Sequence, residues 1–208
     1  WMVSSILPLF ANGTVLITTP LIPIETTVRA LPVGAMSIET ATELFTSLLA
    51  TQRKPDRLAA SMATRITAAL ERHPLTLRIA AAAIQKFGRK LEEFHALLES
   101  SAGVKGTCTS GTLVARWSPM LARVIDEAIS LLDLPTLATL RLLACIAPQP
   151  AFIPLELFEN RGDWNQTRAC LSTLEQLELI SFDSARKSVL IHRTVREVIR
   201  DRISASDL

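Results

Sequence analysis

His192 has the clearest capacity for chemistry in this sequence, because it stands where a predicted strand, Val189–Arg193, passes into an amphipathic helix. An imidazole ring can donate an N–H hydrogen bond or carry a positive charge near neutral pH. Apolar residues recur at helical spacing from Val195 onward, so His192 lies one turn before the apolar stripe, near its buried side. Two interpretations stay open: a ring that contacts a ligand, and a core residue whose ring bonds to a backbone carbonyl.

The other candidates for chemistry in the chain are less suggestive. His73 is interpreted as a helix-boundary residue and His95 as a solvated residue at a helix end, and neither has a recognisable nucleophile or carboxylate motif nearby. No catalytic residue and no metal site is therefore predicted. The charged residues of the last helix are expected on the face opposite its apolar stripe, and they are Arg196, Glu197, Arg200 and Asp201.

The composition predicts an α-rich protein with a core of aliphatic residues. Of the 208 residues 49% are apolar, yet only 5% are aromatic and tyrosine is absent. The net charge of +2 comes from scattered and nearly balanced acids and bases, which disfavours nucleic acid or an anionic membrane as a partner. Three widely spaced cysteines, Cys108, Cys145 and Cys170, indicate ordinary thiols in a reducing compartment.

The N-terminal region contains a strand that needs partners. Residues Thr14–Thr19 form a β-branched run that is typical of a buried strand in a parallel sheet, and no comparable strand is predicted before Leu179. We therefore expect the chain, which begins with Trp1, to start partway through a domain. The hydrophobic stretch Ile6–Ile24 is broken by polar residues and prolines, so no membrane span is predicted. It lacks a basic region before it and a small-residue cleavage site after it, so no signal peptide is predicted either, and we expect a cytoplasmic protein.

Helical periodicity and capping residues predict a small helical bundle after this region. Ser37 is a good N-cap, Pro74 suits a first helical turn, and Gly88 suits a helix end. A loop rich in Ser, Gly and Thr, Ser100–Gly111, is expected to separate this bundle from the next packing unit. The predicted helices are Ile38–Leu49, Arg57–Glu71, Leu75–Phe87 and Leu91–Leu98.

The second half of the chain predicts a winged-helix subdomain, in which helices precede a β-hairpin and a last helix. The hairpin strands are Leu179–Phe182 and Ser188–Ile191. The predicted fold is thus mainly α: residues 1–34 belong to a truncated α/β nucleotide-binding domain, 35–112 to a helical subdomain and 113–208 to a winged-helix subdomain. The helices expected before the hairpin are Met120–Leu132, Pro135–Ile146, Pro154–Phe158 and Trp164–Glu178.

Four short motifs carry a resemblance to a known family when they are taken in order. They are Thr14–Thr19, Leu44-Phe45, His73–Leu77 and Ile191–Arg193. With them the chain resembles the C-terminal part of an NB-ARC nucleotide-binding module, in the STAND class of signalling NTPases that includes plant disease-resistance proteins and the animal apoptosome scaffold. The resemblance implies a regulatory part of a signal-transduction protein that contributes to ADP binding and conformational switching.

The resemblance also implies four nucleotide-binding residues. His192 matches the histidine that reaches the β-phosphate of ADP, and Pro74 matches the proline that lies against the adenine. Thr18 and Thr19, at the end of the sensor strand, would direct hydroxyl groups towards a phosphate or water. Simpler readings remain for Pro74, as a plain helix-start proline, and for the threonines, as residues that favour strands.

The chain departs from the family pattern in ways that bear on activity. Pro20 stands where the family has its sensor arginine, and His73 stands where it has a glycine. No Gly-x-x-x-x-Gly-Lys-Ser/Thr loop and no strand ending in paired acids occurs in the sequence, so the chain alone is not expected to hydrolyse ATP. ADP or ATP would bind only together with an upstream nucleotide-binding half, and oligomerisation on activation would follow the family; the isolated chain is expected to hold no cofactor.

Two other functions remain open on the residues. One is a DNA-binding regulator that uses the winged helix directly, although its candidate recognition helix carries Glu175 and Glu178 as well as Arg168. The other is a protein-interaction module that has lost nucleotide binding, which Pro20 and His73 would favour.

Overall fold

The computed structural model describes residues 31–49, 57–100, 119–146, 152–159, 163–185 and 187–206, and this part is mainly helical with a small antiparallel sheet. Residues Ala35–Leu208 form one compact unit, separate from Trp1–Gly34. The predicted strand Thr14–Thr19 lies outside the described residues. The predicted division between a helical and a winged-helix subdomain falls within the larger unit and stays a prediction. None of the described helices combines the length and the apolar character needed to cross a membrane.

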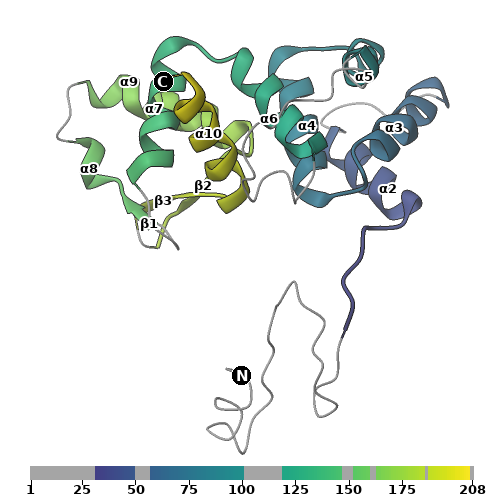
Figure 1. Ribbon diagram of the computed structural model, residues 1–208, viewed down its shortest axis with the longest axis horizontal. Coiled ribbons are helices and arrows are strands. Elements are labelled where there is room, and N and C mark those ends of the chain that lie inside the picture. Colours follow the sequence, from purple (N-terminus) through teal and green to yellow (C-terminus); the bar gives the residue numbers. More distant parts are fainter. Residues whose placement is uncertain are drawn as a thin grey trace, which may run out of the picture. The chain divides into compact units, whose positions relative to one another are not determined.

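Of the first four described helices, which Figure 1 labels, α2 begins and α4 ends at a capping residue that the sequence indicates. The Ser37 hydroxyl accepts the backbone N–H of Thr40 at 3.1 Å, which satisfies a free donor in the first turn of α2. Gly88 ends α4 in the left-handed conformation, at φ 62°. The bounds are α2 Ile38–Leu49, α3 Arg57–Ala69, α4 Pro74–Phe87 and α5 Leu91–Ser100.

Helix α4 is the central element of this region. It is buried almost continuously from Thr76 to Ile84, where a run of four alanines lets neighbouring helices approach closely. It packs against α2 on one side and against α6, Pro119–Ser130, on another. This burial fixes the start of α4, at Pro74, in the structure.

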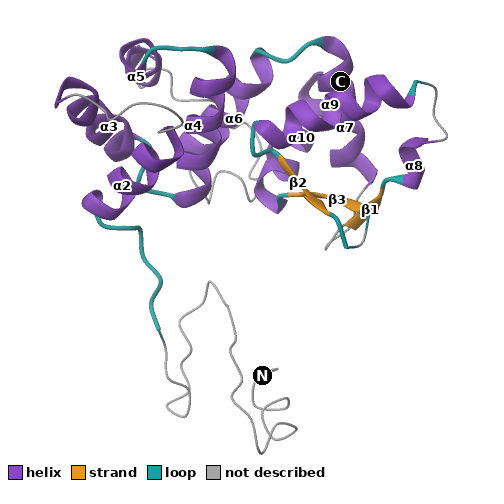
Figure 2. Cartoon of the chain, turned by 180° about the vertical axis from the view of Figure 1, so that it is seen from behind, coloured by secondary structure: helices purple, strands orange, loops and turns teal. Residues whose placement is uncertain are grey.

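The C-terminal elements combine helices with the sheet, which Figure 2 shows in orange. The strand order is β1-β3-β2, and both pairs are antiparallel, with Ile153 opposite Val189 and Ile180 opposite Ile191. The bounds are α7 Leu134–Ile146, β1 Phe152–Pro154, α8 Glu156–Glu159, α9 Trp164–Gln176, β2 Ile180–Asp183, β3 Ser188–Ile191 and α10 Arg193–Ser206.

Strand β1 corrects two predictions. Residues 154–158 were expected to form a helix, and no strand was expected between Thr19 and Leu179, but Phe152–Pro154 pairs with β3 and only Glu156–Glu159 is helical. Three residues are too few to show a strand periodicity, and the pairing partner is distant in the sequence. Pro154 fits the strand because β1 lies at the edge of the sheet, where its missing N–H disrupts no ladder.

Several helix ends also differ from the predicted ones, for a shared physical reason. Helix α3 ends at Ala69 rather than Glu71, since Glu71 and Arg72 both adopt left-handed conformations with φ 57°. Helix α9 ends at Gln176 because Glu178 has φ 58°. Non-glycine residues rarely adopt this conformation, so these helix ends carry no glycine signal in the sequence.

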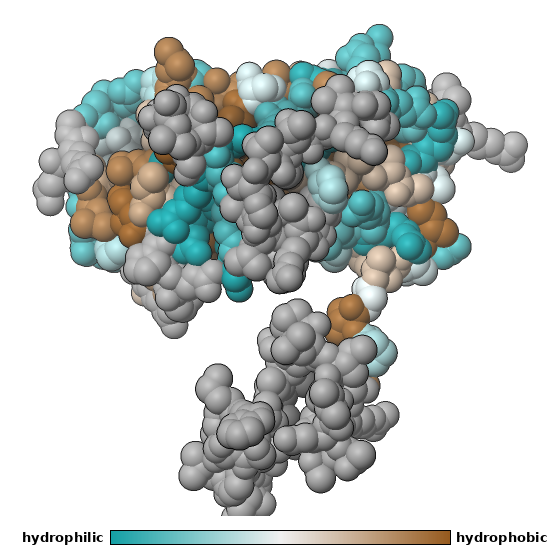
Figure 3. Space-filling view, viewed as in Figure 1, coloured by the Kyte–Doolittle hydropathy of each residue, from teal (hydrophilic) through white to brown (hydrophobic). Residues whose placement is uncertain are grey.

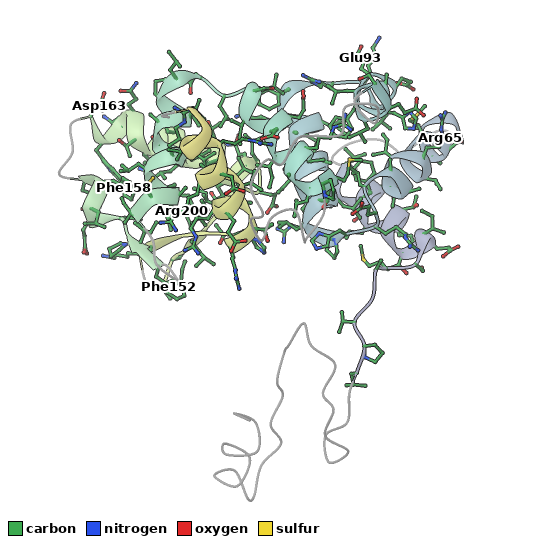
Figure 4. All side chains as sticks on the ribbon, in the orientation of Figure 1. Arg65, Glu93, Phe152, Phe158, Asp163 and Arg200 are labelled. Carbon is green, nitrogen blue, oxygen red and sulfur yellow. The ribbon has the colours of Figure 1, made fainter. Side chains whose placement is uncertain are left out.

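Helix α9 begins at a well-defined cap. The carboxylate of Asp163, labelled in Figure 4, accepts the backbone N–H groups of Asn165 at 2.9 Å and Gln166 at 3.3 Å. Phe158 of α8 is buried, whereas Phe152 of β1 is 41% exposed. The sheet edge therefore leaves apolar surface in contact with solvent.

Candidate functional site

Two of the predicted binding residues lie at the starts of two long helices. Pro74 is the first residue of α4, and His192 immediately precedes α10. The first backbone N–H groups of a helix lack partners within it, and the helix dipole makes this end electropositive. His73, Pro74 and His192 are all exposed, so a ligand can reach them.

His192 uses one ring nitrogen to cap α10. Its Nδ1 accepts the backbone N–H of Thr194 at 3.3 Å, and its carbonyl accepts the N–H of Arg196 at 2.9 Å. Since Nδ1 accepts a hydrogen bond, the neutral ring carries its proton on Nε2. The capping contact thus leaves His192 with an N–H donor on the far side of its ring.

His73 occupies the corresponding position before α4 but behaves differently. Its backbone is extended and its carbonyl accepts the N–H of Leu77 at 3.1 Å, yet its ring does not cap the backbone of α4. The ring Nδ1 lies 3.3 Å from the hydroxyl oxygen of Thr76 instead. The left-handed residues Glu71 and Arg72 precede it directly, so the chain enters α4 through a strained turn.

The two histidine rings are close enough to influence each other. The pKa of His192 lies below its ordinary value of 6.5, chiefly because surrounding atoms displace water from the ring and also because the charge of His73 repels a second positive charge. Although part of His192 is exposed, enough of its ring is surrounded for the charged form to be disfavoured. At neutral pH His192 is therefore an uncharged donor at the start of α10.

Polar contacts join α4 to the end of α9 near this site. Arg78, one turn after Pro74, donates two hydrogen bonds from its Nη2 to the carboxylate of Glu178, at 2.7 and 2.8 Å. Further along α4, the Nζ of Lys86 donates to the Oε1 of Gln176 at 2.6 Å. These contacts orient α4 against the elements that lead to the hairpin and α10.

Helix α6 links the same two regions from another side. Arg89, just after α4, pairs with Glu127 of α6 at 2.6 Å, and both side chains are largely buried. Asp126, the neighbouring residue of α6, pairs with Arg202 of α10. Through α6, the C-terminal part of α10 is thus linked to the residue that follows α4.

Arg196 is a charged residue of this region that the sequence pattern misplaced. It was expected on the polar face of α10, but it is only 6% exposed, one turn after His192. The buried face of α10 is wide enough to include it, between Val195 and Val198. Its position three residues before buried Ile199 is the signal that could have found it, since such residues share a helix face. The arginine adds positive charge to this end of the helix.

Of the remaining residues singled out in the sequence, some lie outside the described part of the structure and one, His95, was wrongly placed. Thr18, Thr19 and Pro20 lie outside the described residues. His95 is not a solvated helix-end residue: it is 7% exposed in the middle of α5, with its Nδ1 3.5 Å from the Oε2 of Glu99. The helix continues to Ser100, which places His95 beside buried Phe94. Among the described residues, no group of three His, Cys, Asp or Glu side chains is arranged to hold a metal ion.

The site combines features suited to an anion attached to an apolar ring. The start of α10 is electropositive, the Nε2 of His192 can donate to an anionic oxygen, and Pro74 exposes a flat apolar ring. A comparison of the chain with protein-family models finds no match, and a comparison with curated proteins finds none either. Function is therefore inferred from the chain itself.

Proposed function

We propose that the chain is the regulatory helical and winged-helix part of an NB-ARC-type signal-transduction NTPase, in which it helps to bind ADP. The observation that carries the proposal is that His192, whose Nδ1 caps α10, has a pKa lowered in part by the charge of His73, the residue before Pro74. The Nε2 of His192 donates to a phosphate oxygen, and the ring of Pro74 lies against the adenine. The chain contributes binding and switching and is not catalytic alone.

The order of the C-terminal elements supports a winged-helix subdomain. Helix α7 is followed by β1, then by α8 and α9, and then by the hairpin of β2 and β3. The short first strand pairs with the second strand of the hairpin, as expected for a winged helix. In this scheme α10 follows the hairpin directly, so His192 moves with the winged-helix subdomain.

A nucleotide that touches both helix starts would couple the two subdomains. Pro74 belongs to the bundle, whereas His192 belongs to the C-terminal elements. A ligand that contacts both favours the arrangement in which they are close, and its loss removes that preference. The contact between His192 and the phosphate then links the nucleotide state to the position of α10.

Two departures from the family define what this module does differently. With Pro20 in place of the sensor arginine, sensing of the γ-phosphate through that position is lost. With His73 in place of a glycine, the module has a second imidazole whose charge influences His192. An anionic phosphate near His192 would favour its protonated form and so oppose the repulsion by which His73 lowers the pKa of His192.

Retention of ADP by the chain together with an upstream nucleotide-binding half tests this function. His192→Ala removes both the cap and the donor, whereas His192→Asn keeps a capping oxygen and lacks the reach of Nε2. We expect both variants to release ADP faster than the parent, with Asn restoring stability but not retention. Unchanged ADP release in His192→Asn would refute the role given to the ring.

A second function, protein interaction, is favoured by one separate observation. A cavity of about 420 Å³ opens between α9 and the β2–β3 hairpin, and much of its lining is apolar. It does not include His73, Pro74 or His192. The two functions can coexist in one chain.

A further inference from the structure

The cavity beside α9 is bounded on one side by the turn of the β2–β3 hairpin, and we call it the α9–hairpin groove. Its apolar part is formed by Leu155, Trp164, Leu171 and Phe182. In the view of Figure 3, hydrophobic surface also gathers at the left, over the region of α8, where Leu157 is 49% exposed. Apolar side chains offer no strong hydrogen-bond donor, so the binding of an anion in the groove depends on its polar residues.

Two cations and two anions line the groove. Arg168 and Glu175 belong to α9, and Asp183 and Lys187 belong to the hairpin. Arg168 and Lys187 are exposed, and their side chains make no hydrogen bond or ion pair with any residue that the structure describes. The Oδ1 of Asp183 accepts the N–H of Ala185 at 3.1 Å, and Glu175 follows Arg168 by about 10 Å along the helix. The groove therefore holds two cationic donors that contacts with the described residues do not use.

Ser184 is the hydroxyl group of the groove that an enzyme can reach. It is exposed in the turn of the hairpin, and its hydroxyl makes no hydrogen bond with any described residue. The other serine that lines the groove, Ser172, is half-buried, and its Oγ accepts the side-chain amide of Gln176 at 3.4 Å. An exposed turn can enter the active site of a modifying enzyme without unfolding of the core.

The residues after Ser184 indicate the class of enzyme. Arg186 and Lys187 stand at the second and third positions after it. Of the serines and threonines that the structure describes, Ser184 alone is followed by basic residues at both of these positions. Protein kinases discriminate between substrates partly by such charge patterns. The turn is therefore suited to a kinase whose substrate-binding surface is acidic.

We propose that Ser184 is phosphorylated by a protein kinase that selects basic residues after the serine, and that Arg168 and Lys187 bind the resulting phosphate. The Oγ of Ser184 attacks the γ-phosphorus of ATP, and the bond from that phosphorus to the oxygen it shares with the β-phosphate breaks. ADP leaves, and the hydroxyl proton passes to the catalytic aspartate of the kinase. This modification does not depend on nucleotide binding at His192.

The phosphate would join two elements of the chain. Arg168 lies on α9 and Ser184 in the hairpin turn, so a phosphate that accepts hydrogen bonds from Arg168 holds the hairpin against the helix. Asp183 and Glu175 repel the phosphate, whereas Arg168 and Lys187 attract it and can also donate hydrogen bonds to it. The modification therefore stabilises the closed arrangement of the hairpin and α9.

The kinase step is tested on the whole chain with ATP and a purified kinase of this class. A peptide of residues 180–189 serves as the control, and mass spectrometry locates the phosphate. We expect Ser184 to be modified in the chain and in the peptide, and Ser184→Ala to abolish this modification. Modification of Ser184 in the peptide but not in the chain would show that the turn is inaccessible and would overturn the proposal. Modification in neither would overturn the choice of kinase class.

Binding of the phosphate is tested with phosphoserine incorporated at position 184 during synthesis of the chain. ³¹P NMR titration compares its second acid dissociation constant with that of the phosphorylated peptide 180–189. We expect a constant about threefold to tenfold larger in the chain, because nearby cations favour the dianion. The peptide also contains Arg186 and Lys187, so the difference reports on Arg168, and Arg168→Gln should remove most of it.

Two controls separate the groove from general electrostatics. Arg141→Gln removes an exposed charge of α7 that does not line the groove, and it should leave the titration unchanged. Phosphoserine at the position of Ser181, which is exposed on β2 and outside the groove, should not respond to Arg168→Gln. Equal constants for the chain and the peptide would overturn the binding of the phosphate. An equal response to Arg168→Gln and Arg141→Gln would do the same.

Discussion

Helices α4 and α10 both begin directly after a histidine, but the two starts are held in different ways. At α4 the ring of His73 does not cap the helix, and Pro74 removes one of the free N–H groups while burial of the following turns fixes the position. At α10 the ring of His192 bonds to the backbone of the first turn. Because Nδ1 of His192 accepts this hydrogen bond, its neutral ring keeps the proton on Nε2 and presents one defined donor. The ring of His73 makes no such bond to the backbone, so its tautomer is not fixed in this way.

The largest expected effect concerns the packing that holds the start of α4. Leu77, in its first turns, is fully buried. We expect Leu77→Ala to lower the free energy of unfolding by about 2–5 kcal/mol, because it leaves a cavity in the core. Urea denaturation measures this loss. The control Leu75→Ala, at a half-buried position, should cost clearly less, and equal costs would contradict the view that burial fixes this helix start.

The next effect concerns the cap of α10. His192→Ala should lower the free energy of unfolding by about 1 kcal/mol, the usual value for loss of a capping group, whereas His192→Asn should stay close to the parent. His73→Ala should cost less than His192→Ala, since its ring does not cap α4. Denaturant midpoints of the three variants provide the measurement. A larger loss for His73→Ala would reverse the comparison.

A third prediction uses the lowered pKa of His192. Because its pKa in the folded protein lies below 6.5, the unfolded chain takes up this proton first as the pH falls. The free energy of unfolding is therefore unaffected by this titration above the ordinary pKa of histidine. It decreases as the pH drops from neutral towards the pKa of His192 in the folded protein. His192→Asn should flatten the decline between about pH 7 and pH 5 relative to the parent.

The influence of His73 on that titration is a separate prediction. His73→Gln removes the repelling charge but leaves the burial of His192, so it should raise the pKa of His192 only part of the way to 6.5. NMR titration of the ring protons measures this pKa. If His73→Gln leaves the titration unchanged, the two rings do not interact.

The smallest expected effect concerns the ion pair between Arg78 and Glu178. Both side chains are partly exposed, so solvent screens the interaction despite its two hydrogen bonds. A double-mutant cycle with Arg78→Ala and Glu178→Ala should give a coupling of about 0.2–1 kcal/mol. A coupling of several kcal/mol would mean that this pair, rather than core packing, holds α4 against α9.

The parts of the fold that depend on local signals were predictable from the sequence. The bounds of α2 are as predicted because Ser37 caps its first turn, and those of α4 follow from Pro74 and Gly88. Strand β1 was missed because its only support is pairing with distant β3. The ends of α3 and α9 were misplaced because Glu71 and Glu178 adopt left-handed conformations without glycine.

The candidate site was less predictable than the helices. Sequence spacing identifies His73 and His192 as helix-boundary residues, but their proximity depends on how α4, α6, α9 and α10 pack. Arg196 was assigned to the polar face, because charged side chains are rarely so deeply buried. The groove beside α9 was missed, since its walls combine a helix face with a hairpin and only the folded chain brings them together.

The most direct test of the account is the ¹⁵N NMR spectrum of the His192 ring, recorded with the nucleotide-binding half present and with ADP added. We predict a neutral ring with its proton on Nε2 and an acceptor at Nδ1, and a shift of the Nε2 signal when ADP binds. His192→Asn identifies the signals by their loss. A proton on Nδ1, or an Nε2 signal that saturating ADP leaves unmoved, would contradict the assignment of His192 as the phosphate contact.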